Sequence, residues 1–338
     1  MALVLRKEKL ASWLAKLASS RQLVAPSNVG GKVLFRQVQS PDQVVLDYTN
    51  TLLSPKEWFF PQTDTILRVR QEGNTPVEVI PVVDETERVI FGIRPCDARG
   101  LFVLDQVFLS DPVDSFYQAR RAKTLLVGLA CLTTSPGCFC TSVGTAPDDP
   151  SNVDVLLTKC DAGYVVEAVT ERGKMAAAAA ELEEMKVELM QQAAPPVVPA
   201  ENLQRILWKT FDSELWARVA DRCLGCRACT YLCPTCYCFN VRDYEQKSGA
   251  SIDRLRGWDS CQAVSFYKLA GGHNPRPTKT SRLRQRFYHK FLYLPDRFGQ
   301  VGCVGCGRCV ENCPVNVDVR EVISKVVEQQ EMVGVESV

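Results

Sequence analysis

The second half of the chain contains the same cysteine motif twice. Residues 223–234 read C-x2-C-x2-C-x3-C-P, and residues 303–314 repeat that spacing. Three closely spaced thiolates can wrap three corners of a [4Fe–4S] cube, while the fourth cysteine of such a motif ligates the other of two clusters. Small residues in the loops let backbone N–H groups approach the cluster sulfurs. The repeat therefore predicts a ferredoxin-like module with two [4Fe–4S] clusters.

The crossover of the fourth cysteine fixes the expected ligand sets. Zinc sites normally use separated cysteine pairs without a third cysteine close behind, so two zinc knuckles are a poor alternative. We predict that the first cluster is held by Cys223, Cys226, Cys229 and Cys313, and the second by Cys303, Cys306, Cys309 and Cys233.

Composition supports metal or redox chemistry in a reducing compartment. The 338 residues include 16 cysteines but only two histidines. The N-terminus shows no signal segment, and no apolar run approaches the ~20 residues that span a bilayer. We therefore expect a cytoplasmic protein without a membrane partner, whose cysteines serve metal or redox chemistry rather than disulfides.

The first 194 residues are expected to form an α+β or α/β domain built on one main sheet. Near the N-terminus, Leu10, Trp13, Leu14 and Leu17 recur at helical spacing. Further along, short β-branched and aliphatic runs alternate with turn-rich connections and a helical stretch at Ala98–Val107. The predicted strands are Val44–Leu46, Val77–Val83, Val89–Ile93, Thr124–Leu129, Val153–Thr158 and Tyr164–Val169.

A proline cluster divides the chain into two parts. Lys174–Gln192 is rich in strong helix formers and predicts a helix that ends at the Pro-rich linker 195–200. A second helix is predicted at Glu201–Arg222. We assign residues 201–338 to a mostly helical domain that carries the dicluster module, with a long insertion at 236–302 between the two motifs.

The N-terminal domain carries a looser set of four cysteines. Cys96 and Cys131 each follow a predicted strand, so both are expected at one edge of the sheet, where ligands collect in α/β folds. Cys138 and Cys140 complete the set. Spacing alone allows either a third metal site or ordinary packing, because free cysteine packs well as a small apolar residue.

Four further cysteines lie outside these sets. Cys236, Cys238 and Cys261 belong to a further cluster, a swapped ligand set or a redox-labile trio, or they simply shield the first cluster. Shielding is the favoured interpretation, since cysteine is readily buried. Cys160 lies in a predicted turn and receives no role.

Residues 276–297 form a basic and aromatic segment, with seven Lys or Arg and one Asp. Such a mixture occurs in proteins that bind single-stranded nucleic acid. The whole chain is balanced, with 40 basic and 39 acidic residues, which argues against that function. We rank electrostatic stabilisation of a cluster or partner first, a solvated surface second and nucleic acid last.

No catalytic residue is predicted. His273 and His289 have no carboxylate partner in view, so neither is a credible general base. The chain also lacks a G-x-G-x-x-G loop between a strand and a helix. Any flavin or nicotinamide site is therefore expected on a partner.

Several short segments, together with the twin motifs, resemble one protein family. They make the chain similar to the iron–sulfur beta subunit of cytosolic nickel–iron hydrogenases (sulfhydrogenases) and to the A subunit of anaerobic sulfite reductase. The resemblance spans nearly the whole chain and is more specific than the ferredoxin motif alone. The segments are Ser54–Pro61, Phe91–Arg99, Val127–Cys131, Cys138–Cys140, Trp258–Cys261 and Gly271–Pro277.

The resemblance implies an electron conduit without substrate chemistry of its own. Such a subunit relays electrons between a partner that binds FAD and NAD(P) and a catalytic partner of nickel–iron hydrogenase or sirohaem sulfite reductase type. It also favours a third cluster at the four N-terminal cysteines, and it makes the insertion a partner-facing or cluster-covering segment. The alternative is the iron–sulfur adaptor of a heterodisulfide-reductase-like or methylene-folate-reductase-like complex.

Overall fold

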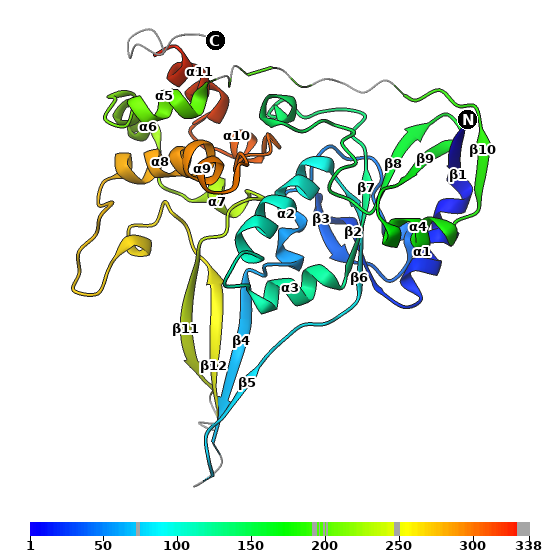
Figure 1. Ribbon diagram of the computed structural model, residues 1–338, viewed down its shortest axis with the longest axis horizontal. Coiled ribbons are helices and arrows are strands. Elements are labelled where there is room, and N and C mark those ends of the chain that lie inside the picture. The colour runs from blue at the N-terminus through cyan, green and yellow to red at the C-terminus, as the bar shows by residue number, and fades with distance from the viewer. Residues whose placement is uncertain are drawn as a thin grey trace.

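Within the described residues, the larger of two sheets has eight strands in the order β10-β1-β9-β8-β7-β6-β2-β3 (Figure 1). The structure is a computed structural model that describes residues 1–71, 75–190, 195, 197–198, 200, 202–246 and 251–329. The strands of this sheet are β1 Ala2–Arg6, β2 Gln22–Val29, β3 Lys32–Gln37, β6 Arg88–Ile93, β7 Thr124–Leu129, β8 Val155–Cys160, β9 Gly163–Ala168 and β10 Leu182–Met185.

The centre of this sheet is parallel and its edges are antiparallel. Strands β2, β6, β7 and β8 run parallel, while β3 closes one edge and β9, β1 and β10 extend the other. Every residue of β6 and β7 is buried. Central parallel strands are covered on both faces, which explains why these two read as nearly continuous apolar runs.

Helices cover both faces of the large sheet. On one face lie α1 (Leu10–Ala18) and α4 (Glu171–Ala178), which bury Trp13 among side chains of β6 and β7. On the other lie α2 (Pro95–Phe108) and α3 (Ser115–Ala122), which share a core with Ile90. This half of the chain is therefore an α/β structure in three layers, with one main sheet as predicted.

The second sheet is antiparallel, in the order β11-β12-β4-β5, and projects from the body as an arm (Figure 1). Its strands are β4 Thr63–Arg70, β5 Glu78–Pro81, β11 Phe239–Glu245 and β12 Ser251–Trp258. β4 and β5 precede the predicted domain boundary, whereas β11 and β12 belong to the insertion at 236–302. Strands from both sides of that boundary thus share one sheet.

The remaining helices pack around a second apolar core, which contains Leu207, Trp216, Phe287 and Ile323. They are α5 Leu203–Lys209, α6 Leu215–Arg222, α7 Ala228–Tyr231, α8 Lys279–Tyr288, a π-helical turn His289–Tyr293, α9 Leu294–Phe298, α10 Arg308–Glu311 and α11 Val319–Val327. Short 3-10 turns occupy Lys7–Lys9, Pro41–Gln43, Pro55–Trp58, Cys140–Val143 and Ser265–Tyr267.

Several sequence predictions differ from the structure. The helix predicted at Lys174–Gln192 ends at Ala178, and β10 follows because its residues pair with β1, with Leu182 opposite Leu5; residues 191 and 192 lie outside the described part. The stretch Val44–Leu46 forms no strand. A predominantly helical second domain is not confirmed, because the insertion contributes β11 and β12.

The helix predicted at Glu201–Arg222 is two helices. The break spans residues 210–214, where the Trp216 indole N–H donates to the Thr210 carbonyl (2.8 Å) and the Ser213 hydroxyl accepts from the Leu215 N–H (3.2 Å). These contacts let α5 and α6 both face the same core. Glu201 lies outside the described residues.

Candidate iron–sulfur centres

Each cysteine motif forms an irregular loop that leads into one short helix. The loop from Cys223 leads into α7 and the loop from Cys303 leads into α10, and the two helices pack against each other. Arg227 and Gly307, which precede these helices, have similar positive φ angles of 71° and 76°. The repeated spacing thus folds into two similar loops that lie side by side.

The four cysteines predicted to hold the second cluster line one pocket. Cys303, Cys306 and Cys309 come from one loop, and Cys233 comes from the end of the other motif. Burial raises the pKa of the Cys303 thiol to about 12 and also raises that of Cys306. Such thiols are protonated at neutral pH and must release their protons when they bind iron. The crossover of Cys233 is therefore present in the fold of the chain itself.

The set predicted to hold the first cluster lies nearer the surface. Cys226 is exposed, whereas Cys223 and Cys313 are partly buried. The Cys223 sulfur accepts a hydrogen bond from the Gly225 N–H (3.3 Å), and the Cys313 sulfur accepts one from the Val317 N–H (3.2 Å). Backbone donors at thiolate sulfurs are among the groups that set the potential of a cluster.

The four N-terminal cysteines also line one pocket. Cys96 lies in the first turn of α2, directly after β6, and Cys131 follows β7. Because β6 and β7 are parallel neighbours, their carboxyl ends meet at one sheet edge. Cys138 and Cys140 contribute from the loop that follows Cys131, and burial raises the pKa of Cys131 to about 11. The fold thus brings together the four N-terminal cysteines, for which sequence spacing alone allowed either a metal site or ordinary packing.

The two pockets share a wall at Cys306, which lines both. The Asn50 amide donates to the Cys306 carbonyl (2.8 Å) and to the Cys138 sulfur (3.7 Å). Gly305 has a φ of +61°, and a Cβ there would lie 2.5 Å from the Cys140 backbone nitrogen, so glycine is required for this approach. Asn50 carried no sequence signal, because its neighbours are distant in the chain.

Two cations of the basic segment 276–297 lie next to cysteine sulfurs. The Lys290 ammonium, in the π-helical turn, donates to the Cys233 sulfur (3.2 Å) and to the Gly302 carbonyl (2.8 Å). Arg286 donates to the Cys236 sulfur (3.5 Å). Burial acts to lower the pKa of Lys290, but the electrostatic effect of the nearby cysteines, Cys233 first, outweighs it and the pKa is raised. These contacts favour the electrostatic role ranked first for this segment.

Lys56 is a third buried cation near the cysteines, and the sequence analysis did not single it out. Its ammonium donates to the carbonyls of Cys233 (3.0 Å) and Cys236 (2.9 Å) and lies 4.0 Å from the centre of the Trp258 ring. Burial lowers its pKa to about 8, although the cysteines partly oppose this shift. Lys56 lies in Ser54–Pro61, one of the segments that carry the family resemblance, and this was the sequence signal that could have identified it.

A buried ion pair joins the second cysteine loop to α2. Arg308 donates to both carboxylate oxygens of Asp97, at 2.7 and 2.8 Å, and also to the Thr51 carbonyl. Both charged side chains are about 1% exposed. Because Asp97 adjoins Cys96 and Arg308 adjoins Cys309, the pair fixes two cysteine-bearing segments relative to each other.

Of the four remaining cysteines, Cys236, Cys238 and Cys261 interact with other cysteines, whereas Cys160 lies apart from them. Cys236 interacts with Cys233, and Cys238 interacts with Cys261. The prediction of a turn at Cys160 is wrong, because Cys160 is the buried last residue of β8; it lines neither cysteine pocket.

Neither histidine takes a place among the pocket-lining residues. His289 shares a hydrogen bond with the Tyr237 hydroxyl (3.0 Å), and burial lowers its pKa to about 4, so it is neutral at pH 7. His273 lies in an exposed loop, where its carbonyl accepts a hydrogen bond from the Leu269 N–H.

The chemistry of the donor sets fits iron–sulfur clusters. Each of the two pockets contains the four cysteines of one predicted set, and Cys306 also lines the N-terminal pocket. Buried cations donate to Cys233 and Cys236, and a [4Fe–4S] cube takes one thiolate per iron. Within the described part of the chain, no three histidine, cysteine or acidic side chains converge as the ligands of a single metal ion would.

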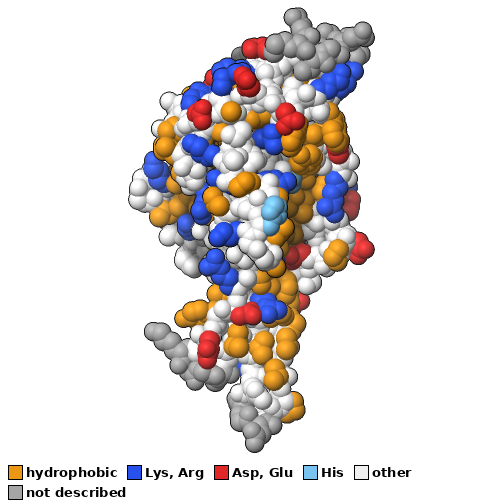
Figure 2. All heavy atoms as spheres, turned by 90° about the vertical axis from the view of Figure 1, so that its left-hand side faces the viewer, with side chains coloured by type: hydrophobic (Ala, Val, Ile, Leu, Met, Phe, Trp, Pro, Cys, Tyr) orange, Lys and Arg blue, Asp and Glu red, His pale blue; other side chains and the backbone are white. Residues whose placement is uncertain are grey.

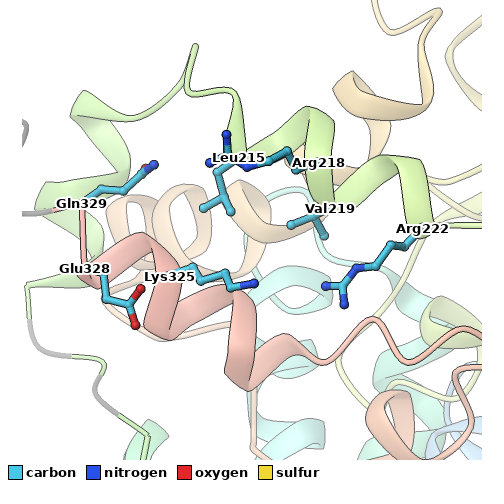
Figure 3. A pocket seen from close by; sticks show the side chains of 7 residues that line it. All are labelled: Leu215, Arg218, Val219, Arg222, Lys325, Glu328 and Gln329. Carbon is cyan, nitrogen blue, oxygen red and sulfur yellow. The ribbon is translucent and has the colours of Figure 1, made fainter.

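A separate surface hollow lies between α6 and α11, close to the first cysteine loop (Figure 3). Leu215 and Val219 form its apolar side, and Arg218, Arg222 and Lys325 are charged residues at its rim (Figure 3). Arg222 immediately precedes Cys223. None of the seven lining residues is a cysteine, so this hollow is not part of the candidate centres. Among the described residues, no helix is both long and apolar enough to cross a membrane.

Comparison with known proteins agrees with this geometry. Residues 222–317 match the family model of the 4Fe-4S dicluster domain. The chain is also similar to the sulfhydrogenase 2 subunit beta of Pyrococcus furiosus, with 32% identity over 340 residues that cover 95% of this chain and 97% of the relative. The chain belongs to the sulfhydrogenase beta-subunit family. The dicluster match makes it an iron–sulfur protein of that family, and no solved structure matches it.

Proposed function

We propose that this sulfhydrogenase-type subunit relays electrons through a row of three [4Fe–4S] clusters. The observation that carries the proposal is the shared wall at Cys306, which places the N-terminal cysteine pocket directly beside the pocket of the second cluster. The packing of α7 on α10 also supports a short distance between the first and second clusters, because these helices follow the two ferredoxin-type loops. Such a row lets single electrons pass from one end of the chain to the other.

The proposed ligand sets follow the pockets and the motif spacing. Backbone N–H groups and the buried cations Lys290 and Arg286 would tune the potentials, since charge and hydrogen bonds at the sulfurs set them. The first cluster takes Cys223, Cys226, Cys229 and Cys313; the second takes Cys303, Cys306, Cys309 and Cys233; the third takes Cys96, Cys131, Cys138 and Cys140.

The two ends of the row suit two different partners in the cytoplasm. One partner would bind FAD and NAD(P), and the other would carry the catalytic centre of a hydrogenase or a sulfite reductase. The relative's name identifies it as one subunit of a sulfhydrogenase, which supports an assembly of this kind. The exposure of Cys226 and of the neighbouring Leu224, which is 67% exposed, supports electron exchange at the first cluster.

The arm supports partner docking through its apolar surface. Figure 2 shows apolar side chains gathered over the arm. On one face, Ile252 lies opposite Val69, and Val69 lies opposite Val79; Ile252 and Val79 are 41% and 57% exposed. Val69, between them, is partly buried. Exposed apolar side chains gathered in this way are a common feature of protein–protein contact sites.

Iron and acid-labile sulfide, measured per chain on anaerobically purified protein, test the proposal. Three clusters give about twelve of each, and two give about eight. Cys131→Ala is expected to remove about four irons, because it opens the third ligand set. The matched control Cys160→Ala changes a buried cysteine outside both pockets and keeps the full count. About eight irons in the unchanged protein would contradict the third cluster, and zinc in place of iron would contradict the relay.

A further inference from the structure

Three cysteines that the cluster assignment leaves unused lie between the ligands of the two ferredoxin-type clusters. Cys236 lies beside Cys233, a proposed ligand of the second cluster, since the Lys56 ammonium donates to the carbonyls of both (3.0 and 2.9 Å) and the two thiols interact. Cys261 is close enough to Cys229, a ligand of the first cluster, for their charges to interact. Cys238 interacts with both Cys236 and Cys261. The trio therefore adjoins both clusters.

The fold of the arm brings Cys238 and Cys261 together. Cys238 immediately precedes β11, and Cys261 follows β12, whose last residue, Trp258, pairs with Phe239. The Asp259 N–H then donates to the Cys238 carbonyl (2.8 Å), which continues the ladder by one step toward the cysteines. The two thiols therefore lie close enough to interact with each other.

The surroundings of the pair favour sulfur chemistry over simple packing. The Gln262 side-chain amide donates to the Cys261 sulfur (3.6 Å) and to the Arg282 carbonyl (2.8 Å), so the donor is held in place. Arg286 lies close enough to act electrostatically on Cys261. Hydrogen-bond donors and cations stabilise the thiolate, which is the reactive form of cysteine.

We propose that Cys238 and Cys261 form a redox-active dithiol that exchanges electron pairs with the adjacent clusters. This inference rests on the proposed function, because the clusters are its electron donors and acceptors. The pair would then store two electrons beside one-electron carriers. It would thereby couple the one-electron clusters to a partner that gives or takes electrons in pairs, such as one that transfers hydride.

The step balances with the clusters as the co-reactants. In the reducing direction, two reduced clusters each lose one electron, the Cys238–Cys261 S–S bond breaks, and each sulfur takes up one electron and one proton. In the oxidising direction, the dithiol releases two protons, two oxidised clusters take up one electron each, and the S–S bond forms. The reaction changes no iron ligand.

Thiol labelling of anaerobic holoprotein tests this step. The protein is reduced with methyl viologen radical or oxidised anaerobically with thionine, then unfolded in N-ethylmaleimide, digested and analysed by mass spectrometry. The expected result is two fewer labelled thiols per chain in the oxidised sample, with a disulfide between the peptides that contain Cys238 and Cys261. Two labelled thiols at these positions in both samples would overturn the inference. Because this measurement uses the unchanged protein, it tests the inference even if the cysteine variants fail to fold.

Variants separate the dithiol from the other roles of these cysteines. Cys238→Ala and Cys261→Ser are each expected to abolish the two-thiol difference while the iron count stays the same. Cys160→Ala, the matched control, keeps both the difference and the iron. Loss of about four irons in Cys238→Ala or Cys261→Ser would overturn the inference, because the pair would then be cluster ligands. Iron-free protein contradicts the proposed function, whereas fully loaded protein without the disulfide contradicts the dithiol alone.

Discussion

The Lys290 ammonium donates a 3.2 Å hydrogen bond to the Cys233 sulfur, and both groups are buried. Lys290 lies in the turn that precedes the second cysteine motif, whereas Cys233 comes from the end of the first motif. The contact therefore stabilises the crossover on which the second ligand set depends. It also places a positive charge beside the proposed second cluster, which would gain negative charge on reduction.

Replacing Lys290 is expected to make the second cluster harder to reduce. Lys290→Met removes the buried cation, so the reduced form loses stabilisation and its potential becomes more negative. Lys290→Arg keeps the charge and is expected to shift the potential less. Redox titration followed by electron paramagnetic resonance measures the change. Lys279→Met, on the exposed start of α8, is the control, and an equal shift in that variant would argue against a local effect.

The Asp97–Arg308 pair is expected to contribute strongly to stability. Asp97→Ala leaves the Arg308 guanidinium buried without its carboxylate, which typically costs about 3–5 kcal/mol. Thermal unfolding of the loaded protein, followed by loss of cluster absorbance, measures the effect. Glu214→Ala breaks an exposed ion pair with Arg218 and should hardly change the midpoint. Similar midpoints for the two variants would contradict the role assigned to the buried pair.

Lys56 predicts a pH dependence of stability with a definite sign. Burial lowers its pKa from 10.5 to about 8 in the folded chain, so between these values the unfolded chain binds more protons. Stability then rises with pH across this window, because the cost of burying the charge disappears. The advantage of the unchanged protein over Lys56→Met should therefore grow between pH 8 and pH 10. A midpoint difference that stays constant with pH would contradict the shift.

Charge on the arm is expected to weaken assembly with a partner subunit. Ile252→Asp places a carboxylate in the apolar row formed with Val69 and Val79, where docking would bury it. Co-purification from the native host should fall while the iron content is unchanged. Val29→Asp introduces the same charge at an exposed valine of the large sheet and serves as control. Undiminished assembly of the Ile252→Asp variant would place the interface elsewhere.

Gly305 is expected to control the contact between the second and third pockets. A side chain there collides with the backbone of Phe139 and Cys140, and the positive φ adds strain. Gly305→Ala should therefore lower the iron content at both centres. Gly271→Ala also replaces a glycine of positive φ, but its Cβ meets no atom within 4 Å and it lies far from the pockets in the chain, so the iron count should stay unchanged. Full iron content in Gly305→Ala would contradict the need for this close approach.

Sequence reasoning worked where structure depends on neighbouring residues. The amphipathic pattern from Leu10 to Leu17 gave α1, and the apolar runs Val89–Ile93 and Thr124–Leu129 gave β6 and β7. It failed at residues 182–185, where pairing with β1 outweighs helix propensity. It also missed the arm, because β4 and β12 are far apart in sequence and only the folded chain pairs them.

The sequence by itself determined the twin four-cysteine motifs and hence the dicluster module, because the spacing of thiols within one loop is a local property. Only the tertiary structure decided that Cys96, Cys131, Cys138 and Cys140 meet in one pocket, that this pocket shares Cys306 with its neighbour, and that Cys238 faces Cys261. These relationships join segments from different strands, loops and sheets. Chain folding sets such distances, and no local pattern in the sequence encodes them.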